Sequence, residues 1–273
     1  IMISYAVDGG GVGPHTDNYD VFLIQARGQR RWRLSDRVYA DAQLLPGCPL
    51  RVLREFDTSE DWILEPGDIL YLPAGLAHWG TGLGECMTWS VGFRAPSAGE
   101  IAAAWVEHRL ATTSDERYRD PSPGSITHPG EIPPQTFDAT RRMCAQWLDP
   151  ETGDFTRWVT GFLSEPKEHL SPMPPATPLS GPDLARRLRA GASLRRAPGA
   201  RILYSRQDEV LHLAASGIVH DLQAGLADLA TLLADRRYVQ ADRLLPWLDD
   251  QQALDLLVTL YNGGQLELED GKG

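Results

Sequence analysis

Residues 1–96 alternate short apolar runs with turn-forming residues, and this spacing restricts the fold more than any other feature of the chain. The runs are rich in β-branched and aromatic residues and are bounded by Gly, Pro or Asp, a pattern typical of strands joined by turns. Five or more such strands predict a barrel or a sandwich. The expected strands lie at residues 2–7, 21–25, 31–34, 69–72 and 87–93.

The pattern becomes helical in the next part of the chain. Ser97 and Glu100 have the spacing of a capping box, which predicts that a helix begins there. Apolar repeats at 137–148 and 155–163 predict two more helices, after a proline-rich connector at 120–134.

A linker and a compact final unit follow. Five prolines between residues 171 and 182 predict the linker, and Pro198 with Gly199 predicts a turn between two later strands. We expect helices at 184–190, 222–234, 241–248 and 251–262, and strands at 194–196, 201–205, 210–214 and 265–269. The chain is therefore predicted to consist of four parts, at 1–96, 97–170, 171–182 and 183–273.

Two of the seven histidines precede residue 100, and each stands in a distinctive segment. His15 and Asp17 are two residues apart, so on a strand their side chains would point to the same face. His78 follows a Glu-Pro-Gly-Asp turn, a β-prone run and a proline, so it would reach them from another strand. Two imidazoles and one carboxylate form the facial triad that binds Fe(II) and leaves positions open for chemistry.

A structural role and a zinc site are the alternatives to iron binding for these three residues. A single histidine near a strand is more often a hydrogen-bonded structural residue, so the metal hypothesis depends on both segments facing each other. A zinc site would more often add a cysteine or a third histidine. Cys48 and Cys86 have no Cys-x-x-Cys spacing, so the sequence favours iron.

Four segments of the chain, at residues 2–25, 28–33, 65–73 and 89–96, resemble the bacterial JmjC/cupin-type ribosomal oxygenases. Within this family, the chain resembles in particular the 2-oxoglutarate-dependent arginine hydroxylases of a large-subunit ribosomal protein. The resemblance implies a mostly β plus α fold, with a double-stranded β-helix barrel, a helical dimerisation-like region and a winged-helix-like domain. Family members carry more residues before the first segment, so we expect the chain to be amino-terminally truncated.

The resemblance also implies a dioxygenase with Fe(II) as its metal and with 2-oxoglutarate and O2 as cosubstrates. Arg30 matches the position at which the family binds the far carboxylate of 2-oxoglutarate, and arginine suits this role because its planar fork binds a carboxylate bidentately. Ser4 and Ser90 lie on strands that should flank the pocket and are further candidates for the same carboxylate. Strand alternation places Arg31 and Arg33 on the opposite face from Arg30. Most arginines are solvated, and for each serine a purely structural role is about equally compatible with the sequence, so these roles need geometric support.

Recognition of a guanidinium substrate requires acidic or aromatic groups near the metal. Asp8, Tyr19 and Asp20 are the candidates, because they are close to the expected ligands in sequence. Asp20 is three residues beyond Asp17, so alternation turns it away unless the strand bends. The glycines at positions 9, 10, 11 and 13 would allow a tight loop or a close approach of substrate backbone.

Charge and cysteine content narrow the choice of partners. The formal net charge of −11 argues against non-specific DNA binding. It would attract a basic polypeptide and so agrees with the ribosomal protein that the resemblance implies, although acidity that serves solubility alone is the commoner case. No apolar stretch reaches the length of a membrane span. Three cysteines without framework spacing suit a reducing compartment, which predicts a cytoplasmic protein, and the family resemblance implies a bacterial one. The family resemblance adds a homodimer to this expectation.

Two rivals remain open at the level of the sequence. One is a related oxygenase that hydroxylates histidine or asparagine instead of arginine. The other is a catalytically silent cupin scaffold that binds a ribosomal protein without turnover. The release of succinate in the presence of iron, 2-oxoglutarate and the candidate protein distinguishes the silent scaffold from either enzyme.

Overall fold

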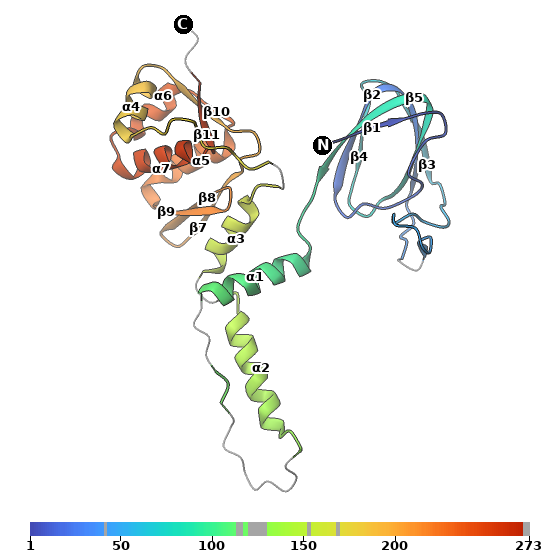
Figure 1. Cartoon of the computed structure of the whole chain (residues 1–273), viewed down its shortest axis with the longest axis horizontal. Helices are drawn as coiled ribbons and strands as arrows, with labels where there is room; N and C mark the ends of the chain where they lie inside the picture. The colour runs from blue at the N-terminus through green and yellow to red at the C-terminus, as the bar shows by residue number, and fades with distance from the viewer. Residues whose placement is uncertain (41–42, 113–116, 120–129, 152–153, 168–169, 270–273) are drawn as a thin grey trace. The chain divides into compact units, whose positions relative to one another are not determined.

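The computed structural model describes residues 1–40, 43–112, 117–119, 130–151, 154–167 and 170–269. The chain forms two compact units, Ile1–Ile101 and Ala102–Gly273 (Figure 1). Among the described residues, no helix is both long and apolar enough to cross a membrane.

The first unit is built on one antiparallel sheet that curls around its interior (Figure 1). Its strand order is β1-β5-β2-β3, and β4 pairs with β2 beside this path. The short strands predicted at residues 2–7 and 69–72 are confirmed, but the runs at 21–25 and 31–34 join into one long strand, and the last strand starts well before residue 87. The bounds are β1 (Met2–Ala6), β2 (Asp20–Ser35), β3 (Glu60–Leu64), β4 (Ile69–Leu72) and β5 (Ala77–Phe93).

A bulge in the middle of β2 explains why two predicted strands became one. The pairing with β5 shifts register between Gln25 and Gln29, and Gly28 adopts a positive φ of 62° inside this bulge. A Cβ atom on Gly28 would collide with the carbonyl oxygen of Glu85, so the bulge requires glycine. Gly28, which lies between the two predicted strands, is therefore part of one continuous strand.

The bulge also changes which residues face inward. Leu23 and Gln25 are buried before it, whereas Arg30 and Trp32 are buried after it. The step from Gln25 to Arg30 is odd, so uninterrupted alternation would have turned Arg30 outward. The core of this unit thus continues across the bulge and contains Val21, Leu23, Trp32, Leu34, Leu64 and Leu72.

Helix α1 (Ala98–Thr112) crosses the boundary between the two units, and α2 (Pro134–Leu148) and α3 (Phe155–Ser164) follow in the second unit. The predicted capping box is confirmed, because the amide N of Ser97 donates to Glu100 and the amide N of Glu100 donates to the Ser97 hydroxyl. Trp105 is buried, and its Nε1 donates to the carbonyl oxygen of Leu148 at 2.9 Å. This contact joins α1 to the end of α2. The predicted connector at 120–134 lies mostly outside the described residues.

The remaining elements form a leucine-rich core between helices and two three-stranded sheets, ordered β10-β6-β11 and β7-β8-β9. Their bounds are α4 (Gly181–Arg189), β6 (Ser193–Arg196), β7 (Ile202–Gln207), β8 (Val210–Ala215), β9 (Ile218–Gln223), α5 (Ala227–Asp235), β10 (Tyr238–Val239), α6 (Ala241–Leu244), α7 (Gln251–Asn262) and β11 (Leu266–Glu269).

Two predictions for this region are wrong in part. Residues 222–234 were expected to be one helix, but Leu222 ends a strand in which it pairs with Leu211, and the helix begins only at Ala227. The helix expected at 241–248 stops at Leu244, because Pro246 follows within a 3₁₀ turn. Strand pairing outweighed the local helical pattern in the first case, and proline broke it in the second.

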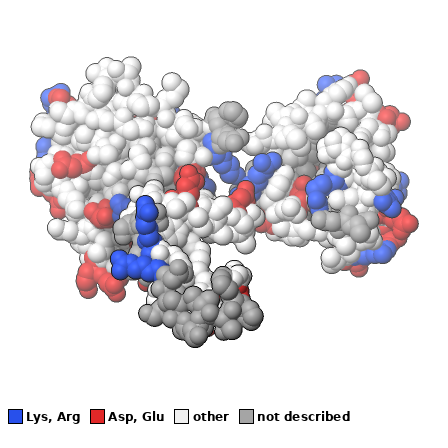
Figure 2. Space-filling model, turned by 60° about the horizontal axis from the view of Figure 1, so that its bottom comes forward, with Lys and Arg blue, Asp and Glu red and all other residues white. Residues whose placement is uncertain are grey.

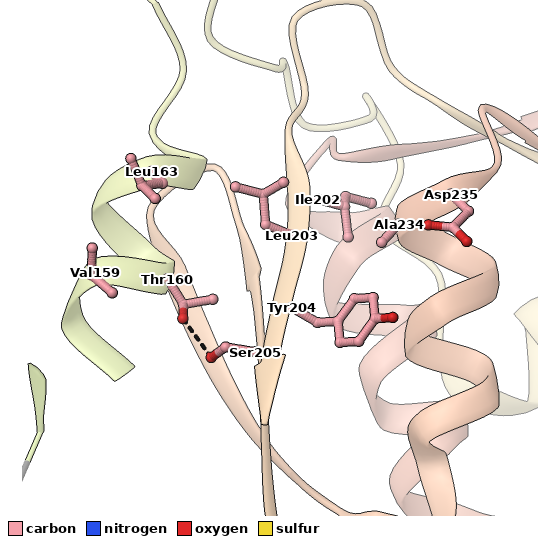
Figure 3. A pocket seen from close by; sticks show the side chains of 9 residues that line it. All are labelled: Val159, Thr160, Leu163, Ile202, Leu203, Tyr204, Ser205, Ala234 and Asp235. Atoms are coloured by element: carbon pink, nitrogen blue, oxygen red, sulfur yellow. Dashed lines mark hydrogen bonds between the residues drawn. The ribbon is translucent and has the colours of Figure 1, made fainter. Parts of the chain in front are cut away.

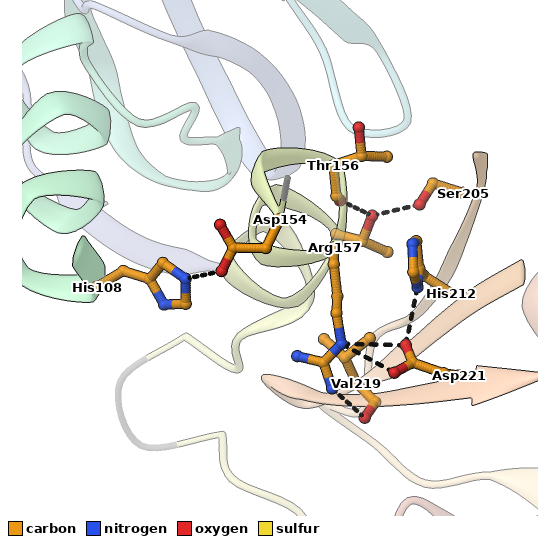
Figure 4. Close-up of polar contacts among 9 residues, drawn as sticks. His108, Asp154, Thr156, Arg157, Ser205, His212, Val219 and Asp221 are labelled. Carbon is orange, nitrogen blue, oxygen red and sulfur yellow. Dashed lines mark hydrogen bonds and ion pairs between the residues drawn. The ribbon is translucent and has the colours of Figure 1, made fainter. Parts of the chain in front are cut away.

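Helix α3 packs against the β7-β8-β9 sheet. Thr160 on α3 shares a hydrogen bond of 2.6 Å with Ser205 on β7, and Nε of Arg157 donates to both carboxylate oxygens of Asp221 on β9 (Figure 4). A groove of about 390 Å³ lies beside this junction, with Val159 and Leu163 on one wall and Tyr204 on another (Figure 3). The third predicted helix therefore belongs structurally with the final unit.

Candidate metal centre and cosubstrate pocket

His15, Asp17 and His78 converge in the first unit, as the sequence predicted. Each offers one candidate ligand atom, and these three atoms lie within 4.8 Å of one another. The route differs from the predicted one, because the segment of His15 and Asp17 is not a regular strand. His15 forms an isolated bridge directly opposite His78, in which the two backbones exchange hydrogen bonds of 3.0 and 2.9 Å. One bridge therefore aligns the two histidines.

Backbone contacts orient both imidazole rings. Nδ1 of His15 lies 2.9 Å from the carbonyl oxygen of Gly13, and Nδ1 of His78 lies 2.9 Å from that of Leu76. A carbonyl accepts only, so each Nδ1 carries the proton and each Nε2 keeps its lone pair. The same arrangement fixes the tautomer of metal-binding histidines in general. Both histidines are thus prepared to bind through Nε2.

The electrostatics of the centre also suit a cation. His78 is buried, and this burial is the main cause of a lowered pKa, with a smaller contribution from His15. A lowered pKa keeps the ring neutral, which is the form that binds metal. Nε2 of His78 lies 3.8 Å from a carboxylate oxygen of Asp17. Two neutral nitrogen donors and one carboxylate on the same side fit Fe(II) and leave its other positions free.

Arg30 is a buried cation that lacks an anion. Only 6% of its surface is exposed, and in the described part of the chain it forms no ion pair. Nη1 makes a long hydrogen bond of 3.4 Å to Ser4, Nη2 makes one of 3.5 Å to the carbonyl of Gly80, and Nε has no acceptor. Burial lowers the pKa of Arg30, which reflects the cost of a charge held away from water. A carboxylate ligand would satisfy these donors, so the site fits the expected cosubstrate.

The side chains of Arg30 and Trp32 occupy the space that a glycine on β5 leaves free. On the inner face of β5, Gly80 and Gly82 follow His78 at alternate positions, opposite Trp32 and Arg30 on β2. A Cβ atom on Gly80 would lie 2.6 Å from the Trp32 ring and 2.9 Å from Nε of Arg30. Any side chain at position 80 would therefore displace the side chains of Trp32 and Arg30 on the inner face of the sheet.

Sequence reasoning missed Gln25, which holds the bulge that turns Arg30 inward. Its side chain is fully buried, and Nε2 donates to the carbonyls of Arg27 at 2.9 Å and Gly28 at 3.0 Å. Its Oε1 accepts from the hydroxyl of Thr88 at 2.9 Å. These bonds satisfy bulge carbonyls that the ladder leaves free. The signal in the sequence was a lone glutamine at an inward position of an apolar strand.

The two predicted serines differ in their contacts. Ser4 donates to the carbonyl of Thr88 at 3.2 Å and accepts from Arg30, so it lies beside the guanidinium. Ser90 is half-buried opposite Leu23, on the same face of β5 as Thr88. The structure thus brings Ser4 to Arg30 and places Ser90 further along the same inner face.

The candidate substrate residues already have partners within the chain. Asp8 accepts a hydrogen bond from the amide of Gly84. Asp20 accepts from the hydroxyl of Tyr71 at 3.0 Å and from the amide of Ala74 at 3.2 Å. The ring of Tyr19 lies under Arg94, with 5.3 Å between the guanidinium carbon and the ring centroid. Any substrate that these residues bind must share them with these contacts.

The arginines on the opposite face behave as alternation predicts. Arg31 is exposed and pairs with Asp61. Arg33 lies over the ring of Trp79, with the guanidinium carbon 3.5 Å from the ring centroid. Neither side chain lies on the inner face of β2, where Arg30 lies. Arg30 therefore differs from these neighbours, because it is buried and, among the described residues, has no charged or aromatic partner on the outer face.

Comparisons with known proteins agree with both units. Residues 1–101 match the family model described as JmjC domain, and residues 147–267 match the ROXA-like winged helix. The ribosomal protein uL16 3-hydroxylase of Escherichia coli is 35% identical over 269 residues, which cover 97% of this chain and 69% of that protein. A probable ribosomal oxygenase of Haemophilus influenzae is 41% identical over 102 residues, or 37% of this chain and 25% of that protein.

A solved structure extends the likeness to three dimensions. The E. coli ribosomal oxygenase YcfD, in complex with cobalt and 2-oxoglutarate, matches with a TM-score of 0.79 and 32% identity. The match covers 98% of this chain and 69% of that chain. Both the sheet of the first unit and the elements of the second therefore have counterparts in one solved protein.

Proposed function

Because this chain belongs to the family of JmjC-domain ribosomal oxygenases with a ROXA-like winged helix, we propose that it is an Fe(II)- and 2-oxoglutarate-dependent dioxygenase that hydroxylates an arginine side chain of a large-subunit ribosomal protein. One observation carries the proposal. Arg30, which is buried and has no counter-ion among the described residues, lies on β2 and faces the inner side of the strand that carries His78, where His78 converges with His15 and Asp17.

The residues of the site would have separate roles in binding the metal and the cosubstrate. His15, Asp17 and His78 hold Fe(II), and Arg30 with Ser4 binds the far carboxylate of 2-oxoglutarate. The bound iron supplies the oxidative chemistry, in which O2 and 2-oxoglutarate are converted to succinate, carbon dioxide and one hydroxyl group on the substrate. The chain itself would fix the ring tautomers through the carbonyls of Gly13 and Leu76 and would hold the buried guanidinium of Arg30 ready for the far carboxylate.

Turnover with a defined peptide tests this function. We expect a peptide of the ribosomal protein uL16 that contains the target arginine to gain the mass of one oxygen atom, with equimolar release of succinate. A peptide with lysine at that arginine should gain no oxygen, and Asp17→Ala should abolish both signals because a ligand is lost. Oxygen gain on a histidine or asparagine would favour the related hydroxylase, and peptide binding without succinate would favour the silent scaffold.

The charges of the winged-helix region support a protein partner over DNA. Arg157, Arg186, Arg189 and Arg195 each form an ion pair with a carboxylate. On the face that Figure 2 shows, basic and acidic side chains are interspersed and no continuous positive patch stands out. Phosphate binding depends on clustered positive charge, so we expect this region to bind polypeptide and to leave duplex DNA unbound.

A ribosomal-protein substrate would place the enzyme in the bacterial cytoplasm.

We also propose that a second copy of the chain covers helix α2. No residue of α2 is buried, yet Phe137, Cys144 and Leu148 share one side of the helix at near-heptad spacing. An apolar helical stripe of this kind is typical of a helix that packs against another helix.

The dimer is tested by mass measurement in solution. Phe137→Glu should convert a dimer into a monomer, because a charge in an apolar interface is costly. Gln135→Glu is the matched control, since Gln135 is exposed on the other side of the same helix and should leave the dimer intact. A wild-type chain that is monomeric at high concentration contradicts the proposal.

A further inference from the structure

Two buried donors on the inner face of β2 have no acceptor among the residues that the structure describes. They are Nε of Arg30 and Nε1 of Trp32, in side chains that are only 6% and 5% exposed. Both groups can only donate, because guanidinium and indole nitrogens have no lone pair to offer. Buried donors without a partner are rare in folded proteins, since they forfeit their hydrogen bonds to water. Because two such donors lie on the same face of one strand, a single ligand could accept hydrogen bonds from both.

The two side chains are neighbours in space as well as in sequence. The guanidinium carbon of Arg30 lies 5.0 Å from the centroid of the Trp32 ring. Across the sheet, Arg30 pairs with Gly82, Trp32 with Gly80 and Leu34 with His78. Trp32 therefore occupies the row between the arginine and the metal ligand, and its ring centroid is 5.9 Å from that of His78.

This placement constrains any ligand that reaches from the metal centre to Arg30. Rows two residues apart on a strand are separated by about 7 Å, so such a ligand must pass the row of Trp32. The facing position on β5 is Gly80, and the Trp32 ring itself fills the space that a side chain there would take. The ligand must also bring acceptor atoms and negative charge, because both free groups are donors and one is a cation.

We infer that the indole N–H of Trp32 donates a hydrogen bond to the far carboxylate of bound 2-oxoglutarate, alongside the guanidinium of Arg30. The inference rests on the proposed function and extends it, since Trp32 becomes a cosubstrate-binding residue and not only a core side chain. Two donors from one strand face then select a 2-oxo acid that carries a second carboxylate.

The chain offers a matched control for this residue. Trp62 lies directly opposite Trp32 in the pairing of β3 with β2, but it is 51% exposed. Its Nε1 already donates to Glu60 at 2.9 Å. Trp62→Phe therefore removes an indole at the position that pairs with Trp32, while the buried side chains of Arg30 and Trp32 stay as they are.

Binding to the cobalt-loaded protein tests the inference without turnover. We expect Trp32→Phe to raise the dissociation constant of 2-oxoglutarate about tenfold or more, the range of a lost hydrogen bond to a charged group. The affinity for 2-oxovalerate, which lacks the far carboxylate, should stay within about twofold, as should both affinities in Trp62→Phe. An unchanged affinity for 2-oxoglutarate, or an equal loss for both acids, overturns the inference, because a purely structural tryptophan would affect both alike.

The same titration separates this inference from the proposed function. If the wild-type cobalt protein fails to bind 2-oxoglutarate, or if Arg30→Met binds it as well as wild type, the proposed cosubstrate site itself is wrong. If Arg30→Met weakens binding and Trp32→Phe does not, only the role of Trp32 fails.

A measurement on the wild-type protein avoids any folding defect of the variant. In the zinc-loaded protein labelled with ¹⁵N at its tryptophans, the Trp32 indole proton should move downfield when 2-oxoglutarate is added, as a new charge-assisted hydrogen bond forms. It should not move in this way with 2-oxovalerate, and the Trp62 signal should stay in place. A Trp32 signal that responds identically to both acids excludes the proposed bond.

Discussion

The His78→Ala protein is expected to lose metal binding and hydroxylation together, the largest effect that we predict. His78 supplies one of three candidate ligands, and alanine keeps the two backbone hydrogen bonds to His15, so the substitution removes the imidazole and leaves the bridge in place. Loss of a residue that merely orients a ligand typically costs about 10- to 100-fold in metal affinity, so loss of the ligand itself should exceed about 100-fold. A cobalt titration followed by absorbance measures the affinity, and succinate release measures the activity.

A histidine elsewhere in the chain provides the control. His220 is half-buried on β9 in the second unit, so His220→Ala should leave both the metal affinity and the turnover of the enzyme near wild type. His78→Ala protein that binds one cobalt ion with wild-type affinity would contradict the assignment of this residue as a ligand.

The second large effect concerns cosubstrate. Arg30→Met should raise the 2-oxoglutarate concentration needed for half-maximal rate by about 10- to 100-fold, because hydrogen bonds to a charged partner contribute about 1.5–3 kcal/mol. The affinity for metal should stay close to wild type, because Arg30 is not next to the metal ligand on the sheet. Arg30 lies opposite Gly82 of β5, whereas the ligand His78 lies opposite Leu34 of β2. The measurement is a steady-state titration of 2-oxoglutarate, with the metal affinity determined in parallel.

Ligand-free stability gives Arg30→Met a second signature. The buried guanidinium has no counter-ion among the described residues, and burial lowers its pKa. Removing an unpaired buried charge should therefore not reduce the free energy of unfolding of the ligand-free protein. Arg31→Met is the adjacent control, because Arg31 is exposed and paired with Asp61. An Arg30→Met enzyme that keeps wild-type dependence on 2-oxoglutarate would show that another residue binds its carboxylate.

Local sequence rules predicted elements whose causes are local. The capping box of Ser97 and Glu100 starts α1 because both hydrogen bonds join residues three apart. The strand at 69–72 is bounded by turn residues on both sides, and the structure keeps it as β4. The same rules failed for residues 222–234, where pairing of Leu222 with Leu211 on another strand decided the outcome.

The sequence by itself determined the chemistry that is available to the site: two imidazoles, a carboxylate and an arginine, each in a segment that could be recognised without coordinates. Only the tertiary structure decided which way these groups face. Arg30 and Trp32 point inward because the bulge at Gly28 shifts the register of β2 against β5, and Gln25 stabilises that bulge. The alternation of side chains along a strand is a local property, but the register is set by hydrogen bonds to a strand some sixty residues away in the chain. No pattern within β2 alone contains that information.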